Sequence, residues 1–315
     1  MSWVDDGTWC DVWIVLRAGT AEVRYTARPG APLRRASYRD VRDLHESVVA
    51  QRRGRPAFIA ECGDTLLRVK WFRSGRREET ETYNLRRLPS RVPHLTETAL
   101  PPPLAERLVD IGGRKGMVIV TGRVGAGKTW TASAIFTTWL ELYSSAGVSI
   151  EDPPELPMEG AWKDGYCWQW EREENALGAG VMESLRSGMR HVYIGEIRTA
   201  DAAREAIKAA AAGYTVIFCL HAGSPVDATQ RLLTMASDAG QEQTVAAMIA
   251  EGLVALVHLD PDPQPDADRH PLTRVKALFG SPNVATLIRN RKFEHLRGEM
   301  ESQAARQWRV SGETG

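Results

Sequence analysis

Gly122-Arg123-Val124-Gly125-Ala126-Gly127-Lys128-Thr129 matches the phosphate-loop pattern G-x-x-x-x-G-K-[ST] at every fixed position. The apolar run 117–120 before it predicts a buried strand, and apolar residues at helical spacing in 130–143 predict the helix after it. A glycine-rich turn between strand and helix lets backbone N–H groups converge on a phosphate at the positive end of the helix. The stretch therefore predicts a nucleoside triphosphate site.

The chemistry of such a loop gives each residue type a role. Lys128 is expected to reach the β- and γ-phosphates of ATP, and the Thr129 hydroxyl to hold Mg²⁺. The residues predicted to contact the nucleotide are Gly122, Val124, Gly125, Ala126, Gly127, Lys128, Thr129 and Trp130.

Length and composition limit the classes of protein. The 315 residues, 43% of them hydrophobic, are enough for two domains, and the 40 basic and 40 acidic residues cancel, so no bulk charge indicates nucleic acid. No apolar run approaches the length of a transmembrane helix. Scattered cysteines without a C-x-x-C pair argue against a zinc site and favour reduced thiols in a cytosolic protein. These cysteines are Cys10, Cys62, Cys167 and Cys219.

The first hundred residues predict a small α+β domain, PAS-like in type, over residues 1–100. A helix over 38–49 is expected from the N-cap residue Ser37 and from an apolar stripe formed by Val41, Leu44, Val48 and Val49. Alternating or β-branched runs predict strands at 11–16, 21–28, 57–61, 65–72 and 82–88.

A proline-rich stretch separates this part from the rest of the chain. Three consecutive prolines in residues 100–104 are stiff and are not expected inside a helix or a central strand, so the linker is placed at 101–108. The remainder, 109–315, is expected to form one α/β domain ending in helices. A polar segment with three prolines at 260–266 is expected to be a loop.

Short apolar strands alternate with helices beyond residue 116. This alternation predicts a parallel sheet covered by helices on both faces. The expected strands are 148–151, 191–197 and 215–221, and the expected helices are 200–212 and 225–235.

Three companion motifs end in groups that could act on a phosphate. The acidic turn at 150–155 contains three carboxylates, a strand over 192–196 ends in Glu196, and a third strand ends in His221. Carboxylates at strand ends near a phosphate loop can orient Mg²⁺ and accept a proton from attacking water. Each motif alone has a plainer interpretation, because acidic turns are usually solvated and a lone histidine is more often structural.

Taken in order, the motifs resemble those of the secretion and pilus traffic ATPases, the superfamily of PilT, GspE and the type IV secretion and conjugation ATPases. The matching blocks are 121–129 (Walker A), 150–155 (Asp box), 194–198 (Walker B) and 213–221 (His box). The resemblance covers about 108–300 and implies a RecA-like ATPase core. The compact chain looks closest to pilus retraction motors and to conjugation or type IVB secretion ATPases.

The resemblance implies roles for further residues. Glu155 would polarise the attacking water, Glu196 would act on Mg²⁺ directly or through water, and His221 would lie near the γ-phosphate. Arginines of the N-terminal domain would reach the phosphates, for which Arg68 and Arg86 are the candidates. Plain surface ion pairs are the alternative for both arginines.

The resemblance also implies an assembly and a place of work. Family members form hexameric rings that power type IV pili, type II or type IV secretion, or conjugation. We therefore expect a homohexamer in the cytoplasm that is peripherally attached to the inner membrane through a platform or secretion-channel protein, without direct nucleic-acid binding. The alternative is a nucleotide-binding assembly subunit with little or no ATPase activity. It is motivated by Tyr214 and Thr199, which replace a usual second histidine and an aspartate.

Two further enzyme classes fit the chain less well. A nucleic-acid translocase would call for a basic stripe interleaved with aromatic residues, which the sequence lacks. A small-molecule kinase would call for an acceptor pocket, which no motif indicates.

Overall fold

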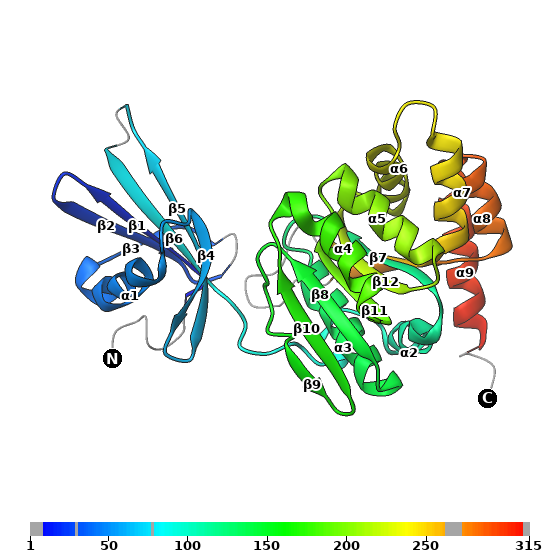
Figure 1. Cartoon of the computed structure of the whole chain (residues 1–315), viewed down its shortest axis with the longest axis horizontal. Helices are drawn as coiled ribbons and strands as arrows, with labels where there is room; N and C mark the ends of the chain where they lie inside the picture. The colour runs from blue at the N-terminus through cyan, green and yellow to red at the C-terminus, as the bar shows by residue number, and fades with distance from the viewer. Residues whose placement is uncertain (1–8, 29–30, 77–78, 262–272, 311–315) are drawn as a thin grey trace. The chain divides into compact units, whose positions relative to one another are not determined.

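The structure is a computed structural model that describes residues 9–28, 31–76, 79–261 and 273–310 (Figure 1). Its contacts divide the chain into two compact units. The first contains the residues up to 91 together with 155–157, and the second contains 92–154 and the residues from 158 onward. The division at Arg91 comes before the expected linker.

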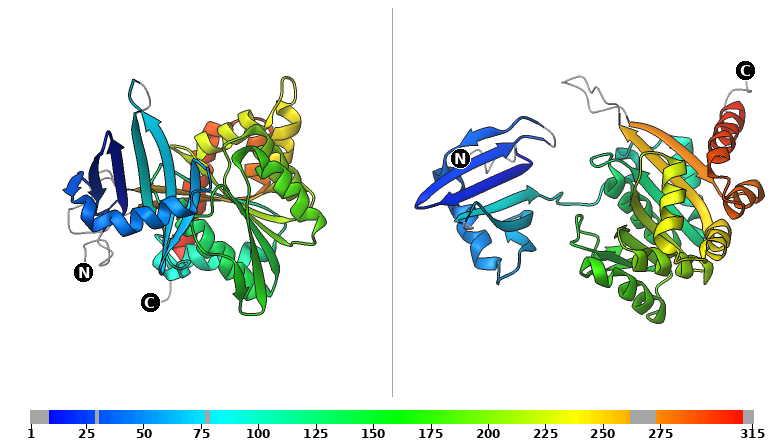
Figure 2. Two further views of the ribbon diagram at one scale, coloured as in Figure 1. Left: turned by 60° about the vertical axis from the view of Figure 1, so that its left-hand side comes forward. Right: turned by 90° about the horizontal axis from the view of Figure 1, so that it is seen from above.

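The N-terminal unit is an antiparallel sheet with one long helix on one of its faces (Figure 2). The strands follow the order β3-β2-β1-β6-β5-β4. Apolar residues of the strands and of α1 form its core. Its elements are β1 (Asp11–Arg17), β2 (Thr20–Thr26), β3 (Arg34–Ala36), α1 (Tyr38–Gln51), β4 (Ala57–Cys62), β5 (Thr65–Ser74) and β6 (Thr80–Arg87).

Helix α1 begins as expected and buries Val41 and Val48 of the expected stripe, but His45 takes the place of Val49. The Ser37 side chain caps it by accepting a hydrogen bond from the Arg39 N–H. Val49, expected in the buried stripe, is 43% exposed, whereas His45 is 6% exposed. The reason is the helical period: Val41, His45 and Val48 are spaced by four and three residues and share one face, and Val49 lies a further 100° around the helix.

The proline stretch begins a helix instead of forming a linker. Helix α2 (Pro102–Asp110) has prolines in its first turn. Backbone N–H groups there make no hydrogen bond within the helix, so proline, which lacks an N–H, removes none. The indole N–H of Trp139 donates to the Leu108 carbonyl oxygen at 2.8 Å. The Arg107 guanidinium stacks 3.6 Å from the centroid of the Phe279 ring. Residues 101–108 are therefore packed into the second unit.

The second unit is built on a mixed sheet in the order β14-β13-β7-β12-β11-β8-β10-β9. The strands from β13 to β10 are parallel, and the edge strands β14 and β9 are antiparallel to their neighbours. The bounds are β7 (Gly116–Gly122), β8 (Ala146–Glu151), β9 (Gly160–Trp162), β10 (Gly165–Glu171), β11 (His191–Glu196), β12 (Thr215–His221), β13 (Leu253–Pro261) and β14 (Thr273–Phe279).

Helices cover both faces of this sheet, which confirms the predicted α/β class with a parallel core (Figures 1 and 2). Helix α3 packs on one face, and α4 to α7 pack on the other. The helices are α3 (Lys128–Tyr143), α4 (Leu177–Arg186), α5 (Ala200–Ala211), α6 (Pro225–Ala236), α7 (Glu242–Gly252), α8 (Pro282–Arg289) and α9 (Leu296–Val310). Four single-turn 3-10 helices, Leu95–Glu97, Ile111–Gly113, Glu174–Ala176 and Phe293–His295, complete the described helices.

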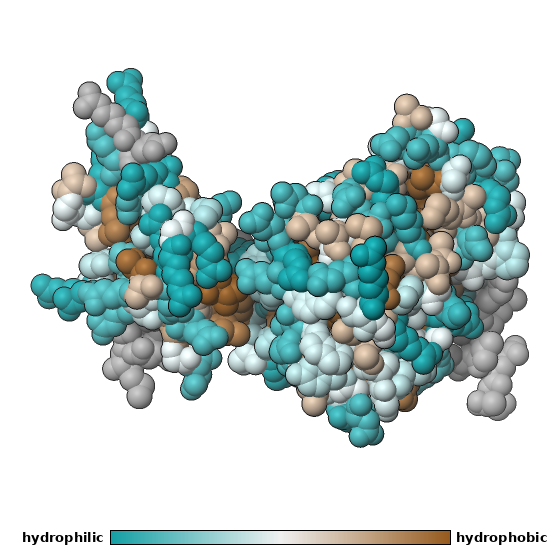
Figure 3. Space-filling view, in the orientation of Figure 1, coloured by the Kyte–Doolittle hydropathy of each residue, from teal (hydrophilic) through white to brown (hydrophobic). Residues whose placement is uncertain are grey.

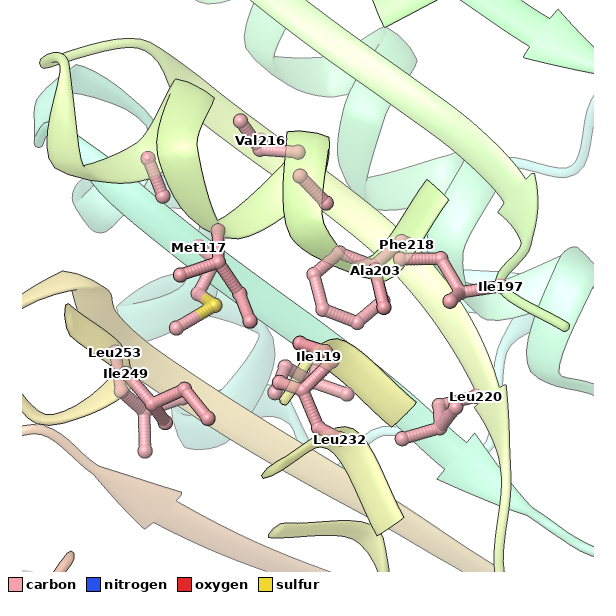
Figure 4. Close-up of a cluster of buried hydrophobic side chains, with 14 of the residues drawn as sticks. Met117, Ile119, Ile197, Ala203, Val216, Phe218, Leu220, Leu232, Ile249 and Leu253 are labelled. Carbon is pink, nitrogen blue, oxygen red and sulfur yellow. The ribbon is translucent and has the colours of Figure 1, made fainter. Parts of the chain in front are cut away.

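The main core lies between the sheet and helices α4 to α7. Figure 4 shows Met117 and Ile119 of β7 in one hydrophobic cluster with side chains from β12 and from the covering helices. The face shown in Figure 3 is mostly hydrophilic or intermediate in hydropathy. Within the described residues, no helix is both long enough and apolar enough to cross a bilayer.

Two expectations concern single residues and loops. All four cysteines are free, with Cys167 and Cys219 buried and the other two half-buried. Of the expected loop at 260–266, Asp260 and Pro261 end β13, and the rest lies outside the described residues.

Candidate nucleotide site

The phosphate loop joins β7 to α3, as predicted. Gly125 and Gly127 have φ angles of 78° and 83°, a region that glycine enters without steric cost. A Cβ on Gly122 would lie 2.5 Å from the Leu259 carbonyl oxygen, so the strand end admits only glycine. The side chain of Val124 is 86% exposed at the tip of the loop.

The amino end of α3 is available to an anion. Its N-cap residue is Gly127, and no side chain caps it. The first-turn N–H groups of a long helix then supply both hydrogen-bond donors and the positive end of the helix dipole. Trp130, predicted to contact the nucleotide, donates its indole N–H to the Glu97 carbonyl oxygen at 3.4 Å. The indole of Trp130 is therefore engaged by Glu97, and Trp130 can offer a phosphate only its backbone N–H, as its neighbours in the first turn do.

Lys128 and Glu196 are brought together. The Lys128 side chain is 10% exposed, and its Nζ lies 3.9 Å from Glu196 Oε1. Nζ also donates to the Arg123 carbonyl oxygen of the loop at 3.2 Å. Arg198 donates to Glu196 Oε2 through Nε at 3.0 Å and Nη2 at 2.5 Å. The Walker B carboxylate is thus held between two cations.

His221 lies at the same edge of the sheet. It ends β12 in register with Gly122 of β7. Its Nδ1 is buried without a hydrogen-bond partner among the described residues. An unpaired ring nitrogen beside the phosphate loop fits a group that can bond a ligand.

The acidic turn contains a buried carboxylate to which the sequence analysis gave no separate role. Glu151, at the end of β8, is 2% exposed and accepts hydrogen bonds from Ser149 Oγ and from Gln169 Nε2, the latter at 2.8 Å. A Cβ on Gly195 would lie 3.0 Å from the Glu151 side chain, so this glycine makes room for it beside Glu196. No sequence signal marked this contact, because Gln169 lies in β10, a strand that was not predicted.

The remaining predicted residues lie in the N-terminal unit. Arg68 Nη1 is 2.5 Å from Glu155 Oε1, between side chains that are 30% and 40% exposed. Arg86 donates to both oxygens of Asp11, at 2.7 and 3.2 Å. These hydrogen bonds to Asp11 raise the pKa of the Arg86 guanidinium. Arg68 and Arg86 are neighbours in register on β5 and β6.

The two departures from the family pattern have local explanations. Tyr214 precedes β12, at the strand's opposite end from His221, and its hydroxyl donates to the Leu185 carbonyl oxygen at 3.1 Å. Thr199 caps α5 by accepting a hydrogen bond from the Ala202 N–H at 3.3 Å. Threonine and aspartate both serve as N-caps, so this replacement keeps the helix start.

A phosphate group and Mg²⁺ fit the residues present. The uncapped helix start and Lys128 suit the phosphates, and the Thr129 hydroxyl with the Glu196 carboxylate suits a hard cation that keeps several of its waters. No cluster of three or more histidine, cysteine or acidic residues suited to a metal occurs among the described residues, so an all-protein cage is not part of this fit.

Comparison with known proteins identifies the family. The family model described as "Type II/IV secretion system protein" matches residues 85–286. A twitching motility protein of Neisseria gonorrhoeae is 27% identical over 76% of this chain and 62% of its own length. The chain spans 60 to 63% of the length of three such curated relatives.

Solved structures support the same fold. The pilus retraction motor PilT with bound ADP superposes with a TM-score of 0.76 at 20% identity, covering 95% of this chain and 87% of that one. The ATPase DotB of Legionella pneumophila gives a TM-score of 0.70 at 18% identity, covering 96% and 89%. The chain belongs to the type II/IV secretion system protein family, as its motifs predicted, and its second unit has the RecA-like core of these ATPases.

Proposed function

We propose that this chain binds ATP with Mg²⁺ at the phosphate loop and hydrolyses it. The observation that carries the proposal is the placement of Lys128 beside the Walker B carboxylate Glu196, at the edge of the sheet where the uncapped α3 begins. Lys128 and the first-turn N–H groups would bind the phosphates, and Thr129 and Glu196 would hold Mg²⁺. Bound there, the cation would neutralise charge on the phosphate oxygens.

The water-activating role is proposed for Glu155, with Arg68 and Arg86 as the arginines that reach the phosphates. The Glu155 side chain is 40% exposed, so a water molecule can approach the carboxylate. Arg86 bonds Asp11 through Nε and Nη2, so it would reach a phosphate through its Nη1. His221, with an unpaired Nδ1, is proposed to bond near the γ-phosphate.

We further propose that the chain forms a hexameric ring that powers a pilus, a type II or type IV secretion system, or conjugation. Its place would be the cytoplasmic face of the inner membrane, on a platform or channel protein. The family match and the similarity to a pilus retraction motor and to DotB support this. The alternative of an inactive assembly subunit has less support, because Tyr214 and Thr199 each have a local structural role.

Phosphate release by the purified chain tests the enzymatic part. Lys128→Ala should abolish ATP binding and turnover, whereas Lys115→Ala, at the opposite end of β7, should leave both unchanged. Glu155→Gln should bind ATP but release phosphate at least about 10²-fold more slowly, as expected for loss of a general base. Wild-type turnover by Glu155→Gln would refute its assigned role, and turnover by Lys128→Ala would refute the site.

Light scattering tests the ring. The mass should rise toward six subunits with a non-hydrolysable ATP analogue. A strictly monomeric chain, with and without the analogue, would refute the motor.

A further inference from the structure

A second histidine lies next to the phosphate-loop strand, on the side away from His221. Strand β13 pairs with β7 so that His258 is the register partner of Thr121, the residue before Gly122. Both side chains point to the sheet face covered by α6 and α7, because they follow Leu256 and Ile119 of the main core by two residues. Nothing in the sequence marked His258, since β13 was not predicted.

Both side chains are buried and lack a protein partner. His258 is 2% exposed and Thr121 is 0% exposed. Thr121 Oγ1 and His258 Nδ1 make no hydrogen bond within the described part of the chain. Leaving a buried polar atom without a partner is unfavourable, so two such atoms on adjacent strands call for a common explanation.

The surroundings of His258 favour the neutral ring. Burial lowers its pKa, and Lys276 and Arg123 act in the same direction, while Asp260 and Asp227 oppose them. A neutral imidazole has one nitrogen that accepts a hydrogen bond, and the Thr121 hydroxyl can donate one. The two unpaired atoms are therefore complementary.

We propose that His258 is a positioning residue of the phosphate site. Its Nδ1 accepts a hydrogen bond from one buried water molecule, which in turn accepts one from the Thr121 hydroxyl, and this bridge fixes the end of β7 from which the phosphate loop departs. The inference rests on the proposed nucleotide site. A polar place with two facing partners on adjacent strands suits a single bridging water.

A double-mutant cycle on nucleotide affinity tests the bond. ATP binding is measured by titration calorimetry for the wild type, Thr121→Val, His258→Leu and the double variant, with the unfolding midpoint recorded without nucleotide. One neutral hydrogen bond is worth about 0.5–1.5 kcal/mol, so each single variant should raise the dissociation constant about 2- to 13-fold. The double variant should be no weaker than the weaker single variant, because both remove the same bond.

Rescue and a matched control separate positioning from packing. His258→Asn keeps an acceptor oxygen near the place of Nδ1 and should restore the wild-type affinity, and His295→Leu, at an exposed site of the same unit, should leave it unchanged. Thr121→Val is nearly isosteric, so the test stands even if His258→Leu does not fold. Unchanged affinity in both single variants, whatever their unfolding midpoints, would overturn the inference alone. Failure of the wild type to bind ATP would overturn the proposed function with it.

Discussion

Replacing Arg86 by Ala should destabilise the N-terminal unit far more than replacing its neighbour Arg68. Asp11 is 3% exposed, and its two carboxylate oxygens accept hydrogen bonds from Arg86 at 2.7 and 3.2 Å. Breaking a fully buried ion pair costs about 3–5 kcal/mol, but the Arg86 side chain is 44% exposed and water can partly replace it. We therefore expect about 2–3 kcal/mol for Arg86→Ala. Arg68 and Glu155 are both substantially exposed, so Arg68→Ala should cost about 1 kcal/mol or less.

Hydrogen exchange read by mass spectrometry measures this difference locally. Peptides covering β1 and β6 should exchange about 30- to 150-fold faster in Arg86→Ala, the factor that corresponds to about 2–3 kcal/mol of local opening. Arg68→Ala is the matched control, because it lies in the same row of the same sheet. Equal exchange in the two variants would refute the reasoning. If Arg86→Ala also left the exchange rates of the wild type unchanged, a loss of turnover in this variant could be ascribed to lost phosphate contact instead of unfolding.

Three further changes have expected outcomes. Gly122→Ala places a Cβ 2.5 Å from the Leu259 carbonyl oxygen and should lower the unfolding free energy by about 1–3 kcal/mol, whereas Gly298→Ala, with open space around it, should stabilise; thermal unfolding compares them. Thr199→Ala should cost about 1 kcal/mol in urea unfolding and Thr199→Asp nearly nothing, so an equal loss in both would refute the capping role. Burial lowers the pKa of His191 to about 4. The unfolded chain therefore binds a proton at a higher pH than the folded chain does. The free energy of unfolding should fall by about 3 kcal/mol as the pH drops from ~6.5 toward 4. An equally steep pH dependence in His191→Asn would contradict this.

Motifs with fixed local spacing could be predicted well. The phosphate loop, the strand before it and the helix after it are set by a few neighbouring residues, and all appear in the structure. The same holds for the Ser37 cap and for the strands at 57–61 and 65–72, which pair as β4 and β5. In these elements, local hydrogen bonds and glycine geometry are sufficient causes.

Features that depend on distant partners were missed. The edge strands β9 and β14 carry no strong pattern alone and exist because β10 and β13 offer them backbone hydrogen bonds. The prolines at 101–103 were interpreted as helix breakers, but the first turn of α2 has no hydrogen bond for them to remove. The partner of Arg86 could not be predicted either, because it is decided by the register between β1 and β6.

The place of β7 in its sheet has a consequence for how the chain must be made. Its two neighbours, β12 and β13, come from residues 215–221 and 253–261, so a ribosome delivers both long after residues 116–122. Until β13 emerges, one edge of β7 stays open, and the turn proposed to bind phosphate lacks its neighbour Leu259. Nascent chains that stop short of this strand should be clients for chaperones and should gain no protection from added nucleotide.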